Sequence, residues 1–183
     1  MVIDKDIKRS LGQMMKGVEV VGASHDGVAR MYTSHWVSQV SFEEPIVMAS
    51  VSPKHDTFGL IERSGVFTVS ILAGDQITEG QYFSYPGHKF NYIGSEFVEM
   101  IDGLPYVPNS IAHLTCRVFD RMSMQDHELF FAEVETVREG RLKQAPLLYS
   151  SRHGWRIGGE KARPPGVSIR DQLLARLEPN ADG

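Results

Sequence analysis

Residues 31–71 read MYTSHWVSQVSFEEPIVMASVSPKHDTFGLIERSGVFTVSI, and this stretch decides the fold. Two long strand-like runs are joined by an acidic turn that contains Pro45. The second run leads into the polar segment SPKHDT at 52–57, which opens a short helix, and a third strand follows directly. That segment combines one Lys with hydroxyl and imidazole donors at a helix N-terminus, and such groups hold a phosphate. The strand at 33–41, TSHWVSQVS, offers small polar residues and one Trp, which suits a flat aromatic ligand.

The rest of the chain reads mainly as strands. Residues 5–16 have helical spacing, 18–24 and 28–41 read as a hairpin around a turn at 25–27, and 84–109 form a long mixed connection of the kind that often serves as a binding loop. The other expected strands are 45–52, 65–72, 111–120, 128–138 and 146–150, and the other expected helices are 56–63, 75–83 and 169–177. We therefore expect a mainly β protein of the α+β type, a closed barrel of six or seven antiparallel strands with peripheral helices.

Composition narrows the class of protein. The 183 residues favour a single domain, and the net charge of −4 argues against a nucleic-acid partner, because a phosphate backbone favours a basic face. The single cysteine, Cys116, cannot form a disulfide within the chain, which indicates a reducing compartment. The sequence contains no signal peptide, no apolar run long enough for a membrane span and no metal-binding spacing. We expect a cytoplasmic, soluble protein without a membrane partner.

A series of motifs along the chain resembles the flavin reductase-like family. In order they are Tyr32-Thr33 before 35–41, Glu44-Pro45-Ile46-Val47, the segment 52–57, Gly65 to Leu72, Lys89-Phe90, Cys116-Arg117-Val118, Asp126 to Phe130 and Pro146-Leu147-Leu148-Tyr149. The resemblance covers about residues 10–155. It implies the FMN-binding split β-barrel, with residues 1–158 as the flavin reductase-like domain and 159–183 as a C-terminal linker and helix.

The resemblance also implies where a flavin would lie. The residues expected along the isoalloxazine ring are His35, Trp36, Val37 and Ser38, and those expected at the phosphate are Ser52, Lys54, His55 and Thr57. Lys89 is expected at the flavin tail or a dinucleotide. His127, which Asp126 would orient, is the expected catalytic residue beside the nicotinamide or the flavin ring. Each position also has a plainer interpretation: an exposed loop charge, a helix cap, a strand-end hydrogen bond or a core aromatic residue.

The function implied by this resemblance is an FMN-dependent NAD(P)H:flavin oxidoreductase, with FAD as a further possible flavin and NADH or NADPH as co-substrate. Hydride would pass from the nicotinamide to flavin N5, and the reduced flavin would serve a partner monooxygenase or another electron acceptor. Flavins in this fold lie at a subunit interface, so a homodimer is expected. Two alternatives stay open: a flavoredoxin-type electron carrier that retains FMN, and a non-catalytic flavin-binding protein. The second arises because His35 and Trp36 are bulkier than the Asn-Ser of the family pattern.

Overall fold

The computed structural model describes residues 3–85 and 95–159, together with residues 166, 168, 170 and 173. Its helices are α1 (Lys5–Leu11), α2 (Asp56–Ser64), α3 (Ile77–Tyr82) and the short 3₁₀ helix η2 (Ser95–Phe97). Its strands are β1 (Lys16–Gly17), β2 (Glu19–His25), β3 (Val28–Ser34), β4 (Val37–Gln39), β5 (Ile46–Val51), β6 (Val66–Ile71), β7 (Glu99–Ile101), β8 (Leu104–Tyr106), β9 (Ala112–Met124), β10 (His127–Glu139), β11 (Leu147–Ser150) and β12 (Gly154–Ile157).

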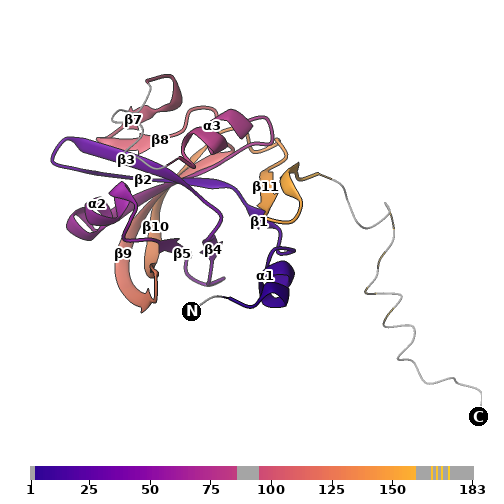
Figure 1. Ribbon diagram of the computed structural model, residues 1–183. Coiled ribbons are helices and arrows are strands. Elements are labelled where there is room, and N and C mark those ends of the chain that lie inside the picture. Colours follow the sequence, from indigo (N-terminus) through magenta and orange to yellow (C-terminus); the bar gives the residue numbers. More distant parts are fainter. Residues whose placement is uncertain are drawn as a thin grey trace, which may run out of the picture.

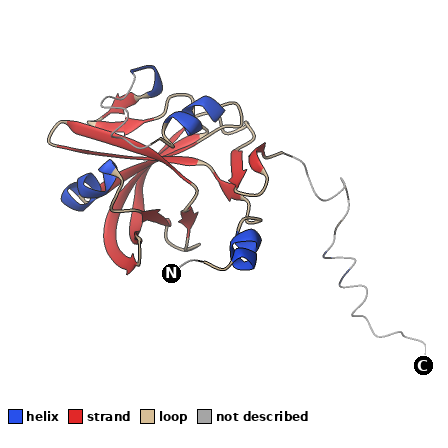
Figure 2. Cartoon of the chain, in the orientation of Figure 1, coloured by secondary structure: helices blue, strands red, loops and turns tan. Residues whose placement is uncertain are grey.

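The main sheet confirms the predicted architecture. Seven antiparallel strands follow the order β3-β2-β6-β9-β10-β5-β4, and the sheet curls on itself while the helices lie at its periphery (Figures 1 and 2). Two small sheets accompany it, one of order β1-β11-β12 and one formed by β7 and β8. The two edge strands of the main sheet, β3 and β4, are consecutive in the chain. The backbone therefore leaves one edge of the sheet and rejoins it at the other.

That crossing interrupts a strand that the sequence predicts as continuous. The expected run 28–41 is divided into β3 and β4, and His35 and Trp36 lie between them. The backbone N–H of Trp36 donates to Ser34 Oγ at 3.1 Å, while the carbonyl of Trp36 accepts from the Ser50 N–H at 2.9 Å. Side-chain and cross-strand hydrogen bonds thus satisfy the backbone at the break. At this break Trp36 is exposed and His35 is half-buried.

Tight turns set the register of the hairpins. The predicted turn between β2 and β3 places Asp26 and Gly27 at φ of 49° and 75°, the left-handed conformation that a two-residue type I′ turn requires. A two-residue turn at Gln125 and Asp126 also joins β9 to β10, pairing His127 with Met124. The Ser52 hydroxyl donates to the Asp126 carbonyl at 3.2 Å. This turn is therefore anchored to the segment that precedes α2.

The core lies on both faces of the sheet. Val20 and Val21 are successive residues of β2, so they point to opposite faces, and both are fully buried. Val21 packs in the cluster inside the curl, with Phe67 and Phe130, whereas Val20 belongs to a second cluster toward β11. Helix α2 contributes Leu60 and Ile61 to the first cluster and ends at Gly65, which has φ of 66°. Cys116 is buried in β9, as its sequence context predicts.

Several local predictions were wrong. The first helix ends at Leu11 instead of residue 16, so Met14 and Met15 lie beyond it and are exposed. Asp4 is its N-cap and accepts from the N–H groups of Asp6 and Ile7. The connection 84–109 contains the unpredicted hairpin β7–β8, and β1 and β12 were not predicted either. The expected helix 169–177 lies mostly outside the described residues, so it and the domain division at residue 158 stay predictions. Within the described part of the chain, no helix is long and apolar enough to cross a membrane.

Candidate functional site

A cavity of about 340 Å³ lies beside the break between β3 and β4. Its walls come from α1, the end of β3, β5, the start of α2, the start of β10 and β11. Its lining includes Lys8, Lys16, Tyr32, His35, Trp36, Ser50, His55, His127, Tyr149 and Ser151. The volume falls in the range of small-molecule sites. Four residues of the sequence prediction, His35, Trp36, His55 and His127, meet here.

Paired rings form much of the wall. Tyr32 stacks on His55 with ring centroids 4.3 Å apart and planes 19° apart. His35 stacks on Tyr149 at 4.4 Å and 15°, and Trp36 meets His127 edge to face at 4.9 Å and 77°. Ring pairs of this kind fix each other's orientation and present flat apolar faces. The cavity is therefore suited to a planar aromatic ligand.

His35 carries an unused hydrogen-bonding atom at this wall. Its Nδ1 is buried and has no hydrogen-bond partner among the described residues. Burial lowers the pKa of His35, a hydrogen bond to the Gly17 backbone opposes this shift, and the charge of Lys16 lowers the pKa further. The imidazole is thus held neutral at neutral pH. A buried unpaired nitrogen is costly, so a ligand that supplies its partner gains binding energy.

His127 has a carboxylate partner. Its Nδ1 lies 3.0 Å from Asp126 Oδ1, and this hydrogen bond lowers the pKa of the exposed Asp126. Burial also lowers the pKa of His55, followed by the nearby charge of His127, while Asp56 opposes the shift. The carboxylate orients the His127 ring, since a hydrogen bond at Nδ1 fixes which nitrogen faces away. The site therefore contains the imidazole of His127, which a carboxylate orients, and the imidazole of His55, whose pKa is lowered.

The predicted phosphate segment lies at the start of α2, at the edge of the cavity. The N-cap of α2, His55, makes no side-chain capping hydrogen bond, so N–H groups of the first turn lack a cap. Lys54 is exposed, and its charge lowers the pKa of Asp126. The Thr57 hydroxyl is buried without a hydrogen-bond partner in the described structure, whereas Ser52 Oγ already bonds to the Asp126 carbonyl. Of the four predicted phosphate residues, only His55 lines the cavity itself.

Other predicted residues lie elsewhere. Val37 and Ser38 line a separate cavity of about 370 Å³ on the main sheet, although they follow Trp36 directly. Lys89 lies outside the described residues. Tyr32, Ser50 and Tyr149 line the aromatic cavity but were not predicted as site residues. Tyr32 and Tyr149 occur in the sequence motifs quoted above, so their aromatic rings were the available signal.

These residues fit a flavin on observations of the structure alone. The ring pairs match a flat heteroaromatic system, and the unpartnered His35 Nδ1 matches its polar edge. The unpartnered Thr57 hydroxyl, the uncapped first turn of α2 and the Lys54 ammonium match a phosphate group. An aromatic surface next to an anion-binding helix start is the pair of features that a flavin nucleotide requires.

Known proteins resemble this chain in sequence and in fold. The family model described as the flavin reductase like domain matches residues 11–157. The reductase component of 4-nitrophenol 4-monooxygenase/4-nitrocatechol 2-monooxygenase from Rhodococcus opacus is 31% identical over 140 residues, which cover 75% of this chain and 74% of that protein. The reductase subunit HsaB of a flavin-dependent monooxygenase from Rhodococcus jostii is 30% identical over 173 residues, which cover 94% of this chain and 86% of that protein. The crystal structure of nitrilotriacetate monooxygenase component B from Mycobacterium thermoresistibile has a TM-score of 0.75 and 27% identity, covering 92% of this chain and 93% of that chain.

Proposed function

Because this chain belongs to the flavin reductase-like family, we propose that it binds FMN and uses it to oxidise NADH or NADPH. The family predicted from the sequence motifs is thereby confirmed. The observation that carries the proposal is the aromatic cavity beside an uncapped helix start, with Lys54 at its edge. When bound, the flavin supplies the redox chemistry, since its N5 accepts the hydride that leaves C4 of the nicotinamide.

The residues of the chain bind and orient the flavin. We assign the polar edge of the ring to the neutral His35 and its flat face to the stacked rings around the cavity. Lys54, Thr57 and the first N–H groups of α2 are assigned to the phosphate, where one ammonium and several donors balance its charge. FAD shares these groups, so the same site serves either flavin.

His127 is assigned to the nicotinamide side of the site. Asp126 holds its ring through Nδ1, and Trp36 packs against its face. An oriented ring limits the positions that a second planar ligand can take, and good orientation lowers the barrier to transfer. The bulk of Trp36 is accommodated because nearly half of its side chain projects into solvent at 49% exposure. Trp36 thus lines the same cavity as His35 and Tyr149 while part of its ring stays in solvent.

Release of reduced flavin to a separate oxygenase is the second part of the proposal. Both curated relatives described above are named as the reductase part of a monooxygenase system. We propose the same role for this chain, with an oxygenase as its partner. The single cysteine, buried at Cys116, agrees with action in a reducing cytoplasm.

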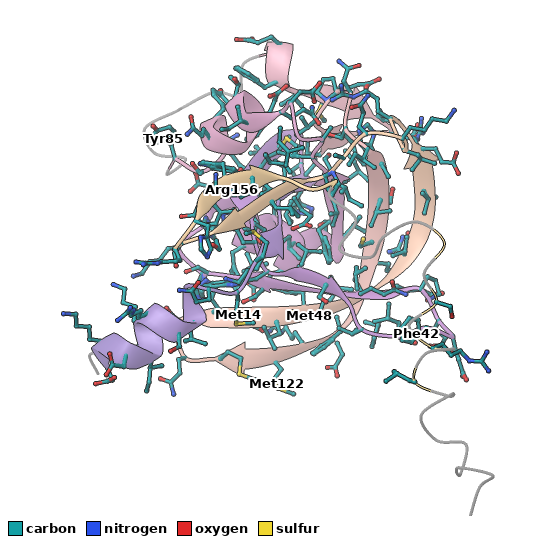
Figure 3. All side chains as sticks on the ribbon, turned by 90° about the vertical axis from the view of Figure 1, so that its right-hand side faces the viewer. Met14, Phe42, Met48, Tyr85, Met122 and Arg156 are labelled. Atoms are coloured by element: carbon teal, nitrogen blue, oxygen red, sulfur yellow. The ribbon has the colours of Figure 1, made fainter. Side chains whose placement is uncertain are left out.

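A homodimer is the proposed assembly. Apolar side chains are exposed on α1, beyond it at Met14, after β4 at Phe42 and on the β9–β10 hairpin at Met122, and the last three are labelled in Figure 3. We propose that these side chains contribute to the contact between the two protomers. Sedimentation equilibrium tests this assembly, for which a mass of twice 20.5 kDa is expected.

The experiment that tests the function follows NADH and NADPH oxidation in the presence of excess free FMN. A reductase that releases its product reduces many equivalents of free FMN per protein molecule. A carrier that retains FMN consumes at most the equivalents that it holds. The absence of turnover with both nucleotides would contradict the proposed function.

A further inference from the structure

A group of cations lies beside the aromatic cavity, and we call it the α1 cluster. It consists of Lys5, Lys8 and Arg9 on α1 and Arg152 in the turn between β11 and β12. These four side chains surround a hollow of about 280 Å³. Positions 5, 8 and 9 fall on one helical face, because residues three and four apart share a side of a helix. Two segments more than 140 residues apart in the chain thus place their charges around one space.

The α1 cluster carries an excess of positive charge. Within the described residues, none of its four members forms an ion pair with a carboxylate. Two acids lie close in sequence: Asp4 is occupied as the N-cap of α1, and Asp6, within the helix, forms no ion pair with the cluster in the described structure, so the cations outnumber these acids. The protein as a whole carries a net charge of −4, so this local excess of positive charge runs against the overall balance. Such a concentration attracts anions and raises their local concentration.

The cluster is held in place by backbone contacts. The N–H of Arg152 donates to the Gly12 carbonyl at 3.0 Å, and His153 Nε2 lies 2.9 Å from Gln13 Oε1. A Cβ atom at Gly12 would come within 2.8 Å of Ser151 Oγ, so glycine permits this close approach of α1 to the turn. The cationic side chains therefore project from a fixed junction.

The hollow joins the aromatic cavity. Lys8, Gly12 and Ser151 line both spaces, and Lys16 lines the larger one. The other cation near the aromatic cavity is Lys54, which precedes α2. In Figure 1, α1 and α2 lie on opposite sides of β4. The aromatic cavity consequently has a cationic group at its α2 end and a larger one at its α1 end.

We propose that the α1 cluster binds the phosphate groups of the nicotinamide nucleotide, while the segment 52–57 holds the flavin phosphate; this rests on the proposed function. Two nucleotides must bring their planar rings together in one cavity for hydride transfer, yet their phosphates repel each other. Separate cationic sites at the two ends of the cavity let both bind at once. The pyrophosphate of NADH and NADPH and the 2′-phosphate of NADPH share the required chemistry.

The test measures binding of NAD⁺ and NADP⁺ to the FMN-loaded protein by calorimetry, so that no turnover is needed. The variant is Lys5→Gln with Arg9→Gln, which removes two charges of the cluster. Its control is Arg63→Gln with Lys143→Gln, two exposed cations that line neither space and have no ion pair in the described structure. A second variant, Arg152→Gln, removes a charge from the other segment without altering α1.

We expect the dissociation constant of the nucleotide to rise at least tenfold in the α1 variant and severalfold in Arg152→Gln. The dissociation constant of FMN should stay within twofold, as should every constant of the control. The nucleotide constant of the wild type should also rise more steeply with salt than that of the variant. A larger loss for NADP⁺ than for NAD⁺ assigns the cluster to the 2′-phosphate, and equal losses assign it to the pyrophosphate.

Two results would overturn the proposal while leaving the proposed function intact: unchanged nucleotide binding in both variants, or loss of FAD binding with nucleotide binding preserved. Loss of FAD binding alone would show that the α1 cluster binds the second phosphate of FAD. If the FMN-loaded wild type bound neither nucleotide, the reductase function would fail together with this inference. A wild type that fails to take up FMN would contradict the proposed function at an earlier step.

Discussion

Two of the cavities among the described residues have similar size but opposite chemistry. The aromatic cavity, of about 340 Å³, gathers ring pairs, two neutral imidazoles and several cations. The second, of about 370 Å³, is enclosed by six strands of the main sheet, and we call it the aliphatic cavity. Most of its lining is aliphatic, such as Val69 and Leu114, and it holds one acid, Glu19. Volume alone therefore does not define a site, whereas convergent polar groups do.

Glu19 shows what an isolated polar group costs. Its Oε2 is buried without a hydrogen-bond partner in the described structure. Burial raises the pKa of Glu19 from the ordinary value of 4.5 to about 8, and a backbone hydrogen bond opposes the shift. The Nδ1 atom of the half-buried His35 also lacks a hydrogen-bond partner in the described structure, but the neighbours of His35 are rings and a cation. The aliphatic cavity gives Glu19 no such surroundings.

The largest expected effect comes from removing this acid. The folded state holds the Glu19 proton more tightly than the unfolded state, so stability falls as pH rises from 4.5 toward 8. Glu19→Gln removes the ionisable group, and we expect the variant to be more stable than the wild type at pH 9 by up to about 5 kcal/mol, at about 1.4 kcal/mol per pKa unit. The two proteins should be nearly equal at pH 4.

Urea unfolding at both pH values measures this difference. Glu43→Gln is the control: Glu43 is exposed, so this substitution should change the free energy of unfolding by a similar amount at both pH values. Equal stability of wild type and Glu19→Gln at pH 9 would show that the aliphatic cavity does not penalise the charge. The contrast between the two cavities would then be lost.

The next effect tests the phosphate end of the aromatic cavity. Lys54→Ala removes one charge-assisted contact, which should weaken FMN binding by about 1.5–3 kcal/mol. Fluorescence titration of FMN measures the change, and Lys143→Ala, an exposed lysine that lines neither cavity, should leave the affinity unaltered. Equal FMN affinity in Lys54→Ala and wild type would show that Lys54 does not bind the flavin phosphate, and the assignment of the phosphate to the segment 52–57 would fail.

A smaller effect is expected at His127. His127→Gln removes the ring that Asp126 orients and Trp36 contacts, so kcat/KM for the nicotinamide nucleotide should fall about tenfold, or about 1.4 kcal/mol. Asp126→Asn keeps the imidazole but weakens its orientation, so its loss should be smaller. Steady-state kinetics at saturating FMN measures both variants. If His127→Gln kept the kcat/KM of the wild type, His127 would have no role in the reaction of the nicotinamide nucleotide.

The smallest effect concerns acid pH. Burial lowers the pKa values of His35 and His55, so the unfolded state binds more protons once pH falls below the ordinary value of 6.5. Stability should therefore decrease from pH 7 toward pH 5, and His55→Gln should reduce the slope. His25→Gln serves as control, since His25 lies at the β2–β3 hairpin and lines neither cavity. If stability depended on pH with the same slope in His55→Gln and wild type, the lowered pKa of His55 would not contribute to the loss of stability at acid pH.

Local sequence signals predicted much of the fold. Alternating strands, the Asp26-Gly27 turn and the helix after residue 55 act through neighbouring residues, and the structure contains all three. The same Asp-Gly signal at 102–103 marks the missed β7–β8 hairpin, where both residues again have positive φ. The rule that predicts a hairpin at Asp26-Gly27 therefore also predicts one at Asp102-Gly103.

Other features depend on contacts that no short window contains. Residues 28–41 read as one continuous strand, yet the strand breaks at His35 because the chain must cross from one sheet edge to the other. Helix α1 ends at Leu11 since Gly12 meets the β11–β12 turn. Similarly, Tyr149 reaches the aromatic cavity through the pairing of β11 with β1. Such residues become site residues only once the sheets have formed.

The central claim is that the aromatic cavity holds a flavin that a nicotinamide nucleotide reduces. The most direct measurement is the visible absorbance spectrum of the FMN-loaded protein, recorded anaerobically before and after addition of NADH and of NADPH. We predict that the visible absorbance bands of the oxidised flavin bleach with at least one nucleotide, because the flavin accepts the hydride. Bands that persist with both would contradict the claim, and a protein that takes up no FMN would contradict it more completely.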